Sequence, residues 1–324
     1  MKAAVFGAGA IGGMVGAALA GAGVETTLIA RGAHLAALKA NGLRVTGAWG
    51  ERTARPRATD DTAAAGPQDY VIVATKAQSA AQAVDAIRPM LGPETVVVTA
   101  VNGVPWWYFH GVPGPLAERP LETVDPGARQ WRLIGPGRAI GCVVFPAAEI
   151  AEPGVIRVLA GDRFVLGEPD GMAKERTRAL AKALIAGGLK VPVRPNVRTE
   201  IWVKLWGNVA FNPISALTRS TMADLIADTG TLALIRVVMT EAEAVARALG
   251  VVLPITLDAR IDGARTVGAH KTSMLQDLER GRSMEIDALV AAVAELGDLT
   301  GVATPMIDAV LALVRRLAVS AGCA

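Results

Sequence analysis

Residues 7–12 restrict the possible folds more than any other part of the chain. They read Gly7-Ala8-Gly9-Ala10-Ile11-Gly12 and lie between a β-type run, Lys2–Phe6, and an alanine-rich helical run that ends at about Ala22. A second β-rich run at residues 26–29 completes a predicted βαβ unit. In such units the first glycine permits a tight turn, the second lets a pyrophosphate approach the backbone, and the third lets helix and strand pack closely. The segment therefore predicts a dinucleotide-binding α/β domain, whose phosphates are held by the free amides of the helix N-terminus.

The same stretch can also be interpreted as a signal peptide or a membrane helix, because residues 3–24 carry no charge and follow Lys2. Seven of those residues are glycines. In a continuous helix each would cost roughly 1 kcal/mol relative to alanine. We therefore expect neither a signal peptide nor a membrane span.

Composition bounds the remaining classes of protein. A chain of 324 residues that is 52% hydrophobic and 19% charged has enough apolar material for two packed domains. Lys+Arg 33 against Asp+Glu 30 leaves a net charge of +3, too small a surplus to indicate nucleic acid or an anionic membrane as a partner. Only Cys142 and Cys323 are present, so we expect no disulfide framework, no metal site and a reducing cytoplasm.

The identity of the dinucleotide is predicted by the end of the second β-run. An acidic residue there would bind the adenosine ribose of NAD, but the chain has Ala30-Arg31-Gly32. Glu25 lies at the opposite end of that run. The planar fork of Arg31 suits a 2′-phosphate, which favours NADPH/NADP over NADH, unless Arg31 is only a solvated loop charge.

Two later β-runs, at residues 70–75 and 95–101, end in polar clusters that contain Lys76 and Asn102. In an open α/β sheet the ligand lies beyond the carboxyl ends of the strands, so both side chains are predicted to face the cofactor. A surface lysine and an Asn-Gly turn are equally good interpretations. Further β-runs and a helix at residues 173–185 extend this NADP-binding Rossmann domain over residues 1–197, followed by an all-α domain over residues 198–324.

The all-α domain opens with a distinctive helical segment at residues 199–213. Lys204, Asn208 and Asn212 recur every four residues and so share one face of the helix. Pro213 predicts that this helix ends or kinks by Asn212. The stripe could be solvated, but asparagine is a poor helix former, which favours a polar site. A lysine ammonium can polarise a ketone and deliver a proton to it as hydride arrives, while amides orient the substrate.

These residues resemble a known family, 2-dehydropantoate 2-reductase, also called ketopantoate reductase. The resemblance runs nearly end to end, and its C-terminal motifs are more specific than the glycine segment. It is carried by G-A-G-A-I-G at 7–12, T-K-A at 75–77, N-G at 102–103, K-L-W-G-N-V-A-F-N-P at 204–213 and S-M-L-Q-D-L-E-R-G-R-S-M-E-I-D at 273–287.

The resemblance implies NADPH-dependent reduction of 2-dehydropantoate to (R)-pantoate, a step toward pantothenate and coenzyme A. It makes Lys204 the proton donor and Glu285 a catalytic glutamate near both lysine and cofactor. The implied substrate contacts are Asn102, Lys204, Asn208, Asn212 and Ser273. The implied cofactor contacts are Gly7, Ala8, Gly9, Ala10, Ile11, Gly12, Arg31, Lys76, Asn102, Ala148 and Glu285.

Physical chemistry supports part of this assignment. A carboxylate such as Glu285 beside an interior lysine favours the protonated, acid form of that lysine. Roles in local structure explain the same residues equally well. Ser283 can be a helix N-cap with Glu285 in the first turn, and Ser273 can cap a helix of its own.

Three departures from the family pattern leave the substrate open. An aromatic segment, from Pro105 to His110, replaces a short glycine turn. Met222 stands where some members have a further substrate-binding asparagine, and residues 111–136 add length. A different 2-oxo acid or ketone is therefore an alternative substrate.

Two more classes of protein share the predicted architecture. One is a non-catalytic NADPH sensor, and the second is a β-hydroxyacid dehydrogenase of the 6-phosphogluconate type. The sensor would not need the polar residues of the helical domain, and the motif at residues 273–287 weighs against the dehydrogenase. The periodic C-terminal helices are compatible with a homodimer as well as with a monomer.

Overall fold

The computed structural model describes residues 1–266 and 268–323 and divides the chain into two compact units. Unit 1 comprises Met1–Val101 with Pro105–Val197, and unit 2 comprises Asn102–Val104 with Arg198–Ala324. The last residue of the predicted second domain, Ala324, lies outside the described residues. The predicted fold class, an α/β unit with a parallel sheet followed by a mostly helical unit, is confirmed.

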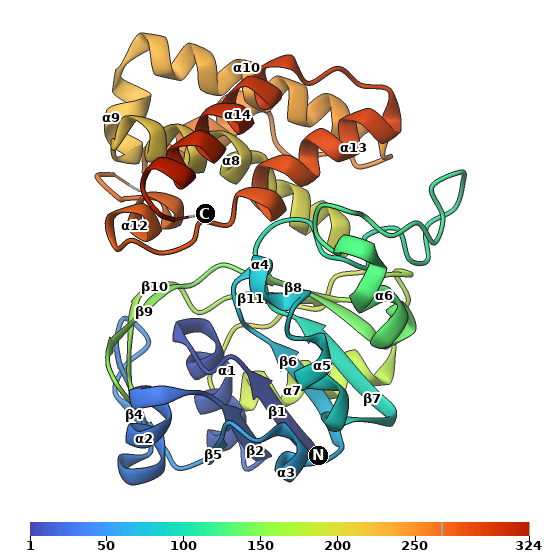
Figure 1. Ribbon diagram of the computed structural model, residues 1–324, viewed down its shortest axis with the longest axis vertical. Helices are drawn as coiled ribbons and strands as arrows, with labels where there is room; N and C mark the ends of the chain where they lie inside the picture. Colours follow the sequence, from blue (N-terminus) through green and yellow to red (C-terminus); the bar gives the residue numbers. More distant parts are fainter. Residues whose placement is uncertain (267, 324) are drawn as a thin grey trace. The chain divides into compact units, whose positions relative to one another are not determined.

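Unit 1 is an alternation of short strands and helices (Figure 1). Its elements are β1 (Lys2–Phe6), α1 (Ala10–Gly21), β2 (Glu25–Ile29), α2 (Gly32–Asn41), β3 (Leu43–Gly47), β4 (Arg52–Ala54), β5 (Arg57–Thr59), α3 (Thr62–Ala65), β6 (Gln68–Val73), α4 (Ala77–Ala80), α5 (Val84–Ile87), η1 (Arg88–Met90), β7 (Leu91–Thr99), η2 (Pro126–Ala128), α6 (Arg129–Leu133), η3 (Pro136–Arg138), β8 (Ala139–Val144), β9 (Ala147–Glu152), β10 (Val155–Ala160), β11 (Phe164–Gly167) and α7 (Glu175–Ala186).

The main sheet has the strand order β11-β8-β7-β6-β1-β2-β5 within the described residues. All neighbouring pairs are parallel except the edge pair of β8 and β11. After β5 the chain crosses to the other side of β1 to form β6, and Figure 1 shows β1, β6 and β7 side by side. The carboxyl ends of β1 and β6 therefore flank a topological switch point, where open α/β sheets bind their ligands.

Helix α1 lies between the main sheet and a smaller sheet of order β4-β3-β10-β9, since it contacts strands of both. Its glycines permit close packing on the two sides. A Cβ at Gly13 would meet Ile156 of β10 at 2.7 Å, and a Cβ at Gly16 would meet Leu28 of β2 at 2.4 Å. The uncharged N-terminal stretch is thus core packing around a 12-residue helix. Among the described residues, no helix is both long and apolar enough to cross a membrane.

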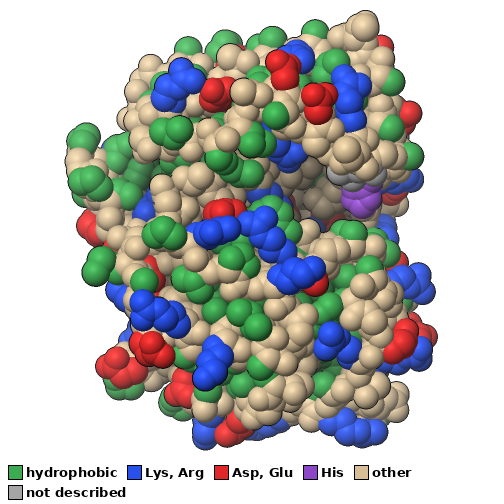
Figure 2. Space-filling model, turned by 180° about the vertical axis from the view of Figure 1, so that it is seen from behind, with side chains coloured by type: hydrophobic (Ala, Val, Ile, Leu, Met, Phe, Trp, Pro, Cys, Tyr) green, Lys and Arg blue, Asp and Glu red, His purple; other side chains and the backbone are tan. Residues whose placement is uncertain are grey.

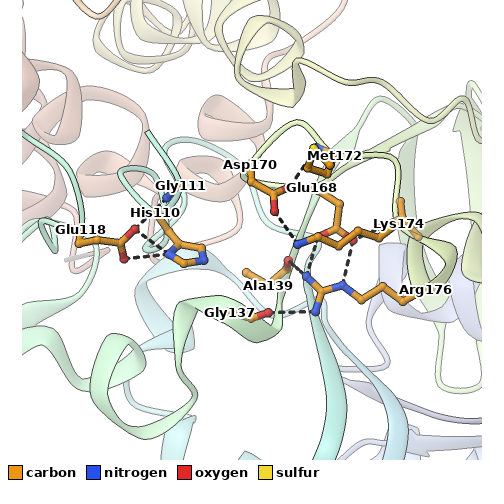
Figure 3. Close-up of polar contacts among 11 residues, drawn as sticks. His110, Gly111, Glu118, Gly137, Ala139, Glu168, Asp170, Met172, Lys174 and Arg176 are labelled. Carbon is orange, nitrogen blue, oxygen red and sulfur yellow. Dashed lines mark hydrogen bonds and ion pairs between the residues drawn. The ribbon is translucent and has the colours of Figure 1, made fainter. Parts of the chain in front are cut away.

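A buried carboxylate ties the end of the main sheet to α7 (Figure 3). Glu168, just after β11, is 2% exposed and accepts hydrogen bonds from the side chains of Arg176 and Thr177. Lys174 lies 3.4 Å from the same carboxylate and also pairs with Asp170. Burial alone would raise the pKa of Glu168, but the Arg176 and Thr177 hydrogen bonds and both cations outweigh it and lower that pKa below 4.5.

The aromatic segment that begins at Pro105 is part of the packing of unit 1. Each ring from Trp106 to Phe109 is no more than 3% exposed. Trp106 meets Trp131 edge to face, and Trp107 packs against Gly141 of β8, where a Cβ would come within 2.8 Å of its ring. These four rings are therefore buried residues of unit 1.

In the described part of unit 2 the regular elements are all helices, and these helices carry the yellow to red end of the colour scale in Figure 1. Its elements are α8 (Val197–Thr218), α9 (Met222–Ala227), α10 (Thr229–Ala248), α11 (Leu257–Arg265), α12 (Ser273–Glu279), the π-helix η4 (Asp287–Ala291), α13 (Ala292–Thr300) and α14 (Pro305–Ser320).

Pro213 predicted that the helix ends or kinks by Asn212, and the first of these two alternatives is wrong. Helix α8 continues through Pro213 to Thr218. Proline cannot donate to the carbonyl four residues earlier, and its presence inside a helix costs about 3 kcal/mol. The residues beyond it are nevertheless buried, including Ile214 and Ala216 at 2% and 0% exposure, and this packing offsets the lost hydrogen bond.

Charge on the face of the molecule drawn in Figure 2 is mixed rather than segregated. Figure 2 shows Lys and Arg side chains scattered among acidic and hydrophobic ones on the face in view. Both cysteines, Cys142 and Cys323, are buried thiols, and neither forms a disulfide among the described residues.

Candidate active site

The glycine-rich turn has the geometry that its sequence predicts. Gly7 follows β1 with a φ of +92°, which favours glycine, and a Cβ there would meet Thr75 at 2.7 Å. A Cβ at Gly12 would lie 2.2 Å from the Gly7 carbonyl oxygen, so the third glycine permits close packing of α1 on β1. At Gly9 a Cβ would meet nothing within 4 Å. The backbone beside Gly9 is therefore open to a ligand.

The other predicted cofactor residues of unit 1 lie at neighbouring strand ends. Lys76 is the N-cap of α4, directly after Thr75, and Arg31 is the N-cap of α2, two residues after β2. Since β6, β1 and β2 are adjacent parallel strands, both basic residues follow the same edge of the sheet as the glycine turn. Ala148 differs, because it lies in β9 of the smaller sheet, paired with Val158.

Unit 2 brings together three predicted residues that are far apart in sequence. The Lys204 ammonium of α8 donates to Asn102 Oδ1 at 2.6 Å, and Asn102 Nδ2 donates to Glu285 Oε2 at 2.8 Å. An ammonium only donates and a carboxylate only accepts, so the two contacts fix the orientation of the Asn102 amide. Glu285 is 5% exposed. Asn102 thus links the lysine to a buried carboxylate.

A close backbone contact positions Asn102. The next residue, Gly103, has a φ of +84°, and a Cβ on it would come within 2.1 Å of the Ala288 carbonyl oxygen. Val104 N–H donates to that same carbonyl at 3.0 Å. Ala288 belongs to the π-helix η4, which begins two residues after Glu285. The Asn-Gly pair therefore holds Asn102 against the segment that carries the glutamate.

The two asparagines of α8 differ in their surroundings. Asn212 is 5% exposed, and its Nδ2 donates to Ser273 Oγ at 3.4 Å. Asn208, one turn nearer to Lys204, is half-buried, and its side chain has no hydrogen-bond partner among the residues that the structure describes. The predicted stripe thus offers an amide, at Asn208, that is free to meet a ligand.

The capping interpretations of Ser273 and Glu285 are wrong. Thr272 is the N-cap of α12, and its hydroxyl accepts from Leu275 N–H, so Ser273 is the first helical residue. Glu285 precedes the helical residues that begin at Ile286 and therefore is not a first-turn acid. Ser273 is thus not the N-cap, and Glu285 lies directly before the helix, where its carbonyl accepts from Leu289 N–H at 3.3 Å.

Sequence reasoning overlooked one side chain at the glycine turn. The imidazole of His34 in α2 lies 2.8 Å from the Ala8 carbonyl oxygen. A single histidine in a short helix matches no motif, and only the strand order reveals that α2 begins beside the turn.

A glycine turn at a switch point and a lysine linked through an amide to a carboxylate are the parts of a nicotinamide-dependent oxidoreductase. Residues 3–171 match the family model described as ketopantoate reductase PanE/ApbA, and residues 196–318 match that of its C-terminal part. The chain belongs to this family, which confirms the resemblance seen in its motifs.

Individual relatives agree with the family assignment over the full length. The chain is 58% identical to a 2-dehydropantoate 2-reductase of Mesorhizobium japonicum, covering 100% of this chain and 99% of the relative. It is 32% identical to the crystal structure of a PanE/ApbA family ketopantoate reductase from Ralstonia eutropha JMP134, covering 99% of both chains with a TM-score of 0.83.

One more distant structure has the same fold. It is a D-mandelate dehydrogenase with NADH and anilino(oxo)acetate, 23% identical, covering 100% of both chains with a TM-score of 0.81. At that level of identity the likeness concerns the fold alone.

Proposed function

We propose that this chain reduces the ketone of 2-dehydropantoate to the alcohol of (R)-pantoate with NADPH, in the cytoplasm, and that Lys204 is the proton donor. The observation that carries the proposal is the Asn102 amide held between the Lys204 ammonium and the Glu285 carboxylate. The choice of substrate is supported by the 58% identical relative, which is named 2-dehydropantoate 2-reductase and matches this chain over its full length.

The residues of unit 1 fit the cofactor. The open space beside Gly9 and the close packing at Gly12 suit a pyrophosphate on the N-terminus of α1. Arg31 provides a planar fork for the 2′-phosphate, and Lys76 a second cation at the same sheet edge. When bound, NADPH supplies the hydride that forms the new C–H bond at the ketone carbon.

The chain itself supplies the proton. The Lys204 ammonium polarises the ketone oxygen and gives it a proton as negative charge develops there, which converts C=O to C–OH. Asn102 keeps the ammonium oriented and transmits the charge of Glu285 to it through two hydrogen bonds. Asn208 and the Asn212–Ser273 pair orient the substrate's oxygen atoms.

The first experiment follows NADPH absorbance with 2-dehydropantoate, a panel of other 2-oxo acids, and NADH in place of NADPH. We expect turnover with 2-dehydropantoate and NADPH. Replacement Lys204→Ala should lower kcat at least about 100-fold with little change in NADPH affinity. The exposed Lys182→Ala variant on α7 is the matched control. An equal loss of cofactor affinity, or near-normal turnover by Lys204→Ala, would exclude the proton-donor role.

A second candidate function is reduction of a different 2-oxo acid, and Met222 is the observation that favours it. Met222 begins α9, and its backbone N–H donates to the His270 carbonyl at 3.0 Å, which places it beside the segment leading to Ser273. A thioether cannot replace the hydrogen bonds of an asparagine to a hydroxylated substrate. If an apolar 2-oxo acid is the better substrate, Met222→Asn should shift the preference toward 2-dehydropantoate.

A further inference from the structure

His34 uses both nitrogens of its ring. Nε2 lies 2.8 Å from the carbonyl oxygen of Ala8, the second residue of the glycine-rich turn. Nδ1 lies 3.1 Å from the backbone nitrogen of Gly154, in the turn between β9 and β10. The imidazole therefore joins the start of α2, the glycine turn and the smaller sheet.

These two partners determine the protonation state of the ring. A carbonyl only accepts a hydrogen bond and an amide N–H only donates one, so the proton is on Nε2 and Nδ1 is an acceptor. The ring is therefore neutral. Burial lowers the pKa of His34 below 6.5, although the hydrogen bond to Ala8 acts in the opposite direction.

The hydrogen bond to Ala8 also controls the neighbouring amide. The Ala8–Gly9 peptide is trans, so its C=O and N–H point in opposite directions. With the carbonyl held by His34, the Gly9 N–H points away from the imidazole. That N–H has no acceptor in the described part of the chain, and the space beside Gly9 is open. The amide is thus ready to donate to a phosphate oxygen.

We propose that His34 is a positioning residue of the cofactor site, which holds the Ala8 carbonyl so that the Gly9 N–H faces the pyrophosphate of the dinucleotide. This inference rests on the proposed NADPH-dependent function. Helix α2 carries both His34 and its N-cap Arg31. The start of α2 therefore holds the glycine-rich turn through His34 and carries Arg31, the residue proposed to bind the 2′-phosphate.

Two conservative substitutions separate the two hydrogen bonds. In His34→Gln the amide nitrogen can take the place of Nε2 and still donate to Ala8, whereas in His34→Asn the amide oxygen can take the place of Nδ1 and still accept from Gly154. Loss of the Ala8 bond should weaken NADPH binding about tenfold. We expect this loss in His34→Asn and His34→Ala, near wild-type affinity in His34→Gln, and unchanged kcat at saturating NADPH in all three.

Fragments of the cofactor distinguish positioning from a general effect on folding. 2′-Phospho-ADP-ribose contains the pyrophosphate, and adenosine 2′-monophosphate lacks it. Calorimetric titration should show that His34→Asn loses affinity for the first fragment and keeps it for the second. His110→Ala, which removes a histidine paired with Glu118 elsewhere in unit 1, is the control.

The inference would be overturned by His34→Asn binding NADPH as tightly as His34→Gln, or by equal losses for both fragments. Failure of the wild-type protein to bind NADPH would instead overturn the proposed function. The two failures are therefore distinguishable.

Discussion

At the scale of single residues, the cofactor turn depends on which glycine has space around it. Gly9 and Gly12 are three residues apart, yet a Cβ would meet open space at the first and the Gly7 carbonyl oxygen at 2.2 Å at the second. The φ of Gly9 is −74°, which any residue can adopt. Two glycines of the same motif are therefore needed for different physical reasons. Gly9 leaves space for a ligand, and Gly12 lets the backbone of α1 pack closely on Gly7.

We expect Gly9→Ala to weaken NADPH binding at least about tenfold while its melting temperature without ligand stays near that of the wild type, since the new methyl occupies only the ligand's space. Gly12→Ala should lower the melting temperature itself, because the methyl displaces backbone. Calorimetric titration and thermal unfolding of both variants measure the difference. A Gly9→Ala variant that binds NADPH normally would contradict this assignment.

A second residue-scale prediction concerns the amide between Lys204 and Glu285. Asn102→Asp keeps the shape of the side chain but replaces the donor to Glu285 with a carboxylate oxygen, so two like charges face each other. We expect kcat to fall at least about 100-fold, with a smaller effect on NADPH affinity. Steady-state kinetics at saturating NADPH provide the measurement, and a normal kcat would show that the amide does not act through its donor.

At the scale of elements, the site depends on the short segment Asn102–Val104 meeting one irregular helix of the same unit. The segment after β7 approaches the π-helix η4 closely at Gly103, and Val104 donates to the Ala288 carbonyl. π-Helical turns are rare in proteins, and those that occur are often found at functional sites. Here the π-helix supplies the carbonyl that anchors Asn102.

Gly103→Ala should disrupt this anchor, since its Cβ would lie 2.1 Å from the Ala288 oxygen and its φ of +84° disfavours alanine. We expect kcat to fall by at least about tenfold, together with a loss of roughly 1–3 kcal/mol in the free energy of unfolding. Denaturant unfolding and steady-state kinetics measure the two effects. Gly50→Ala, at a positive φ in an open turn, controls for strain alone; equal kinetic losses in both variants would refute the role of the contact.

At the scale of the whole molecule, the structural features predicted correctly from sequence are those formed by residues close together in the chain. The βαβ unit around Gly7 and the helical stripe that begins at Lys204 are periodic patterns of neighbouring residues, and both form as predicted. Pro213 misled the prediction because burial of the residues beyond it outweighs local helix propensity. Asn102 bridges two residues that are distant in sequence: Lys204 is 102 positions away from it and Glu285 is 183 positions away. At such separations the spacing of residues in the sequence predicts no contact.

The same distinction explains the remaining differences between expectation and structure. Ser273 is a plausible N-cap in sequence, but the backbone geometry makes its neighbour Thr272 the N-cap. Trp106 and its aromatic neighbours follow Asn102-Gly103 directly in sequence, yet the chain returns to unit 1 at Pro105 and these rings are buried there. The roles of the site residues remain proposals that the experiments on Lys204, Asn102 and His34 test.

Stability of the whole molecule should depend on pH through Glu168. Its pKa is lower in the folded protein than its ordinary value of 4.5, so the stabilisation is complete above about pH 4.5 and is lost as the pH falls through the folded pKa. Glu168→Gln should therefore be less stable by about 3 kcal/mol at pH 7, with a difference that shrinks in acid. Denaturant unfolding at pH 7 and pH 3 checks this, and Glu175→Gln, exposed on α7, is the control. A difference independent of pH would contradict the charge-based explanation.

The short segment Asn102–Val104 has a consequence for modularity. The chain passes between its two units three times, after Val101, after Val104 and after Val197. A single cut at residue 197 would therefore produce a helical fragment that retains Lys204 and Glu285 but lacks the amide that joins them. Recombination that exchanged the helical part alone would pair this lysine and glutamate with another chain's asparagine. An exchange that keeps this lysine and glutamate with their own asparagine must therefore carry residues 102–104 along with the helical part.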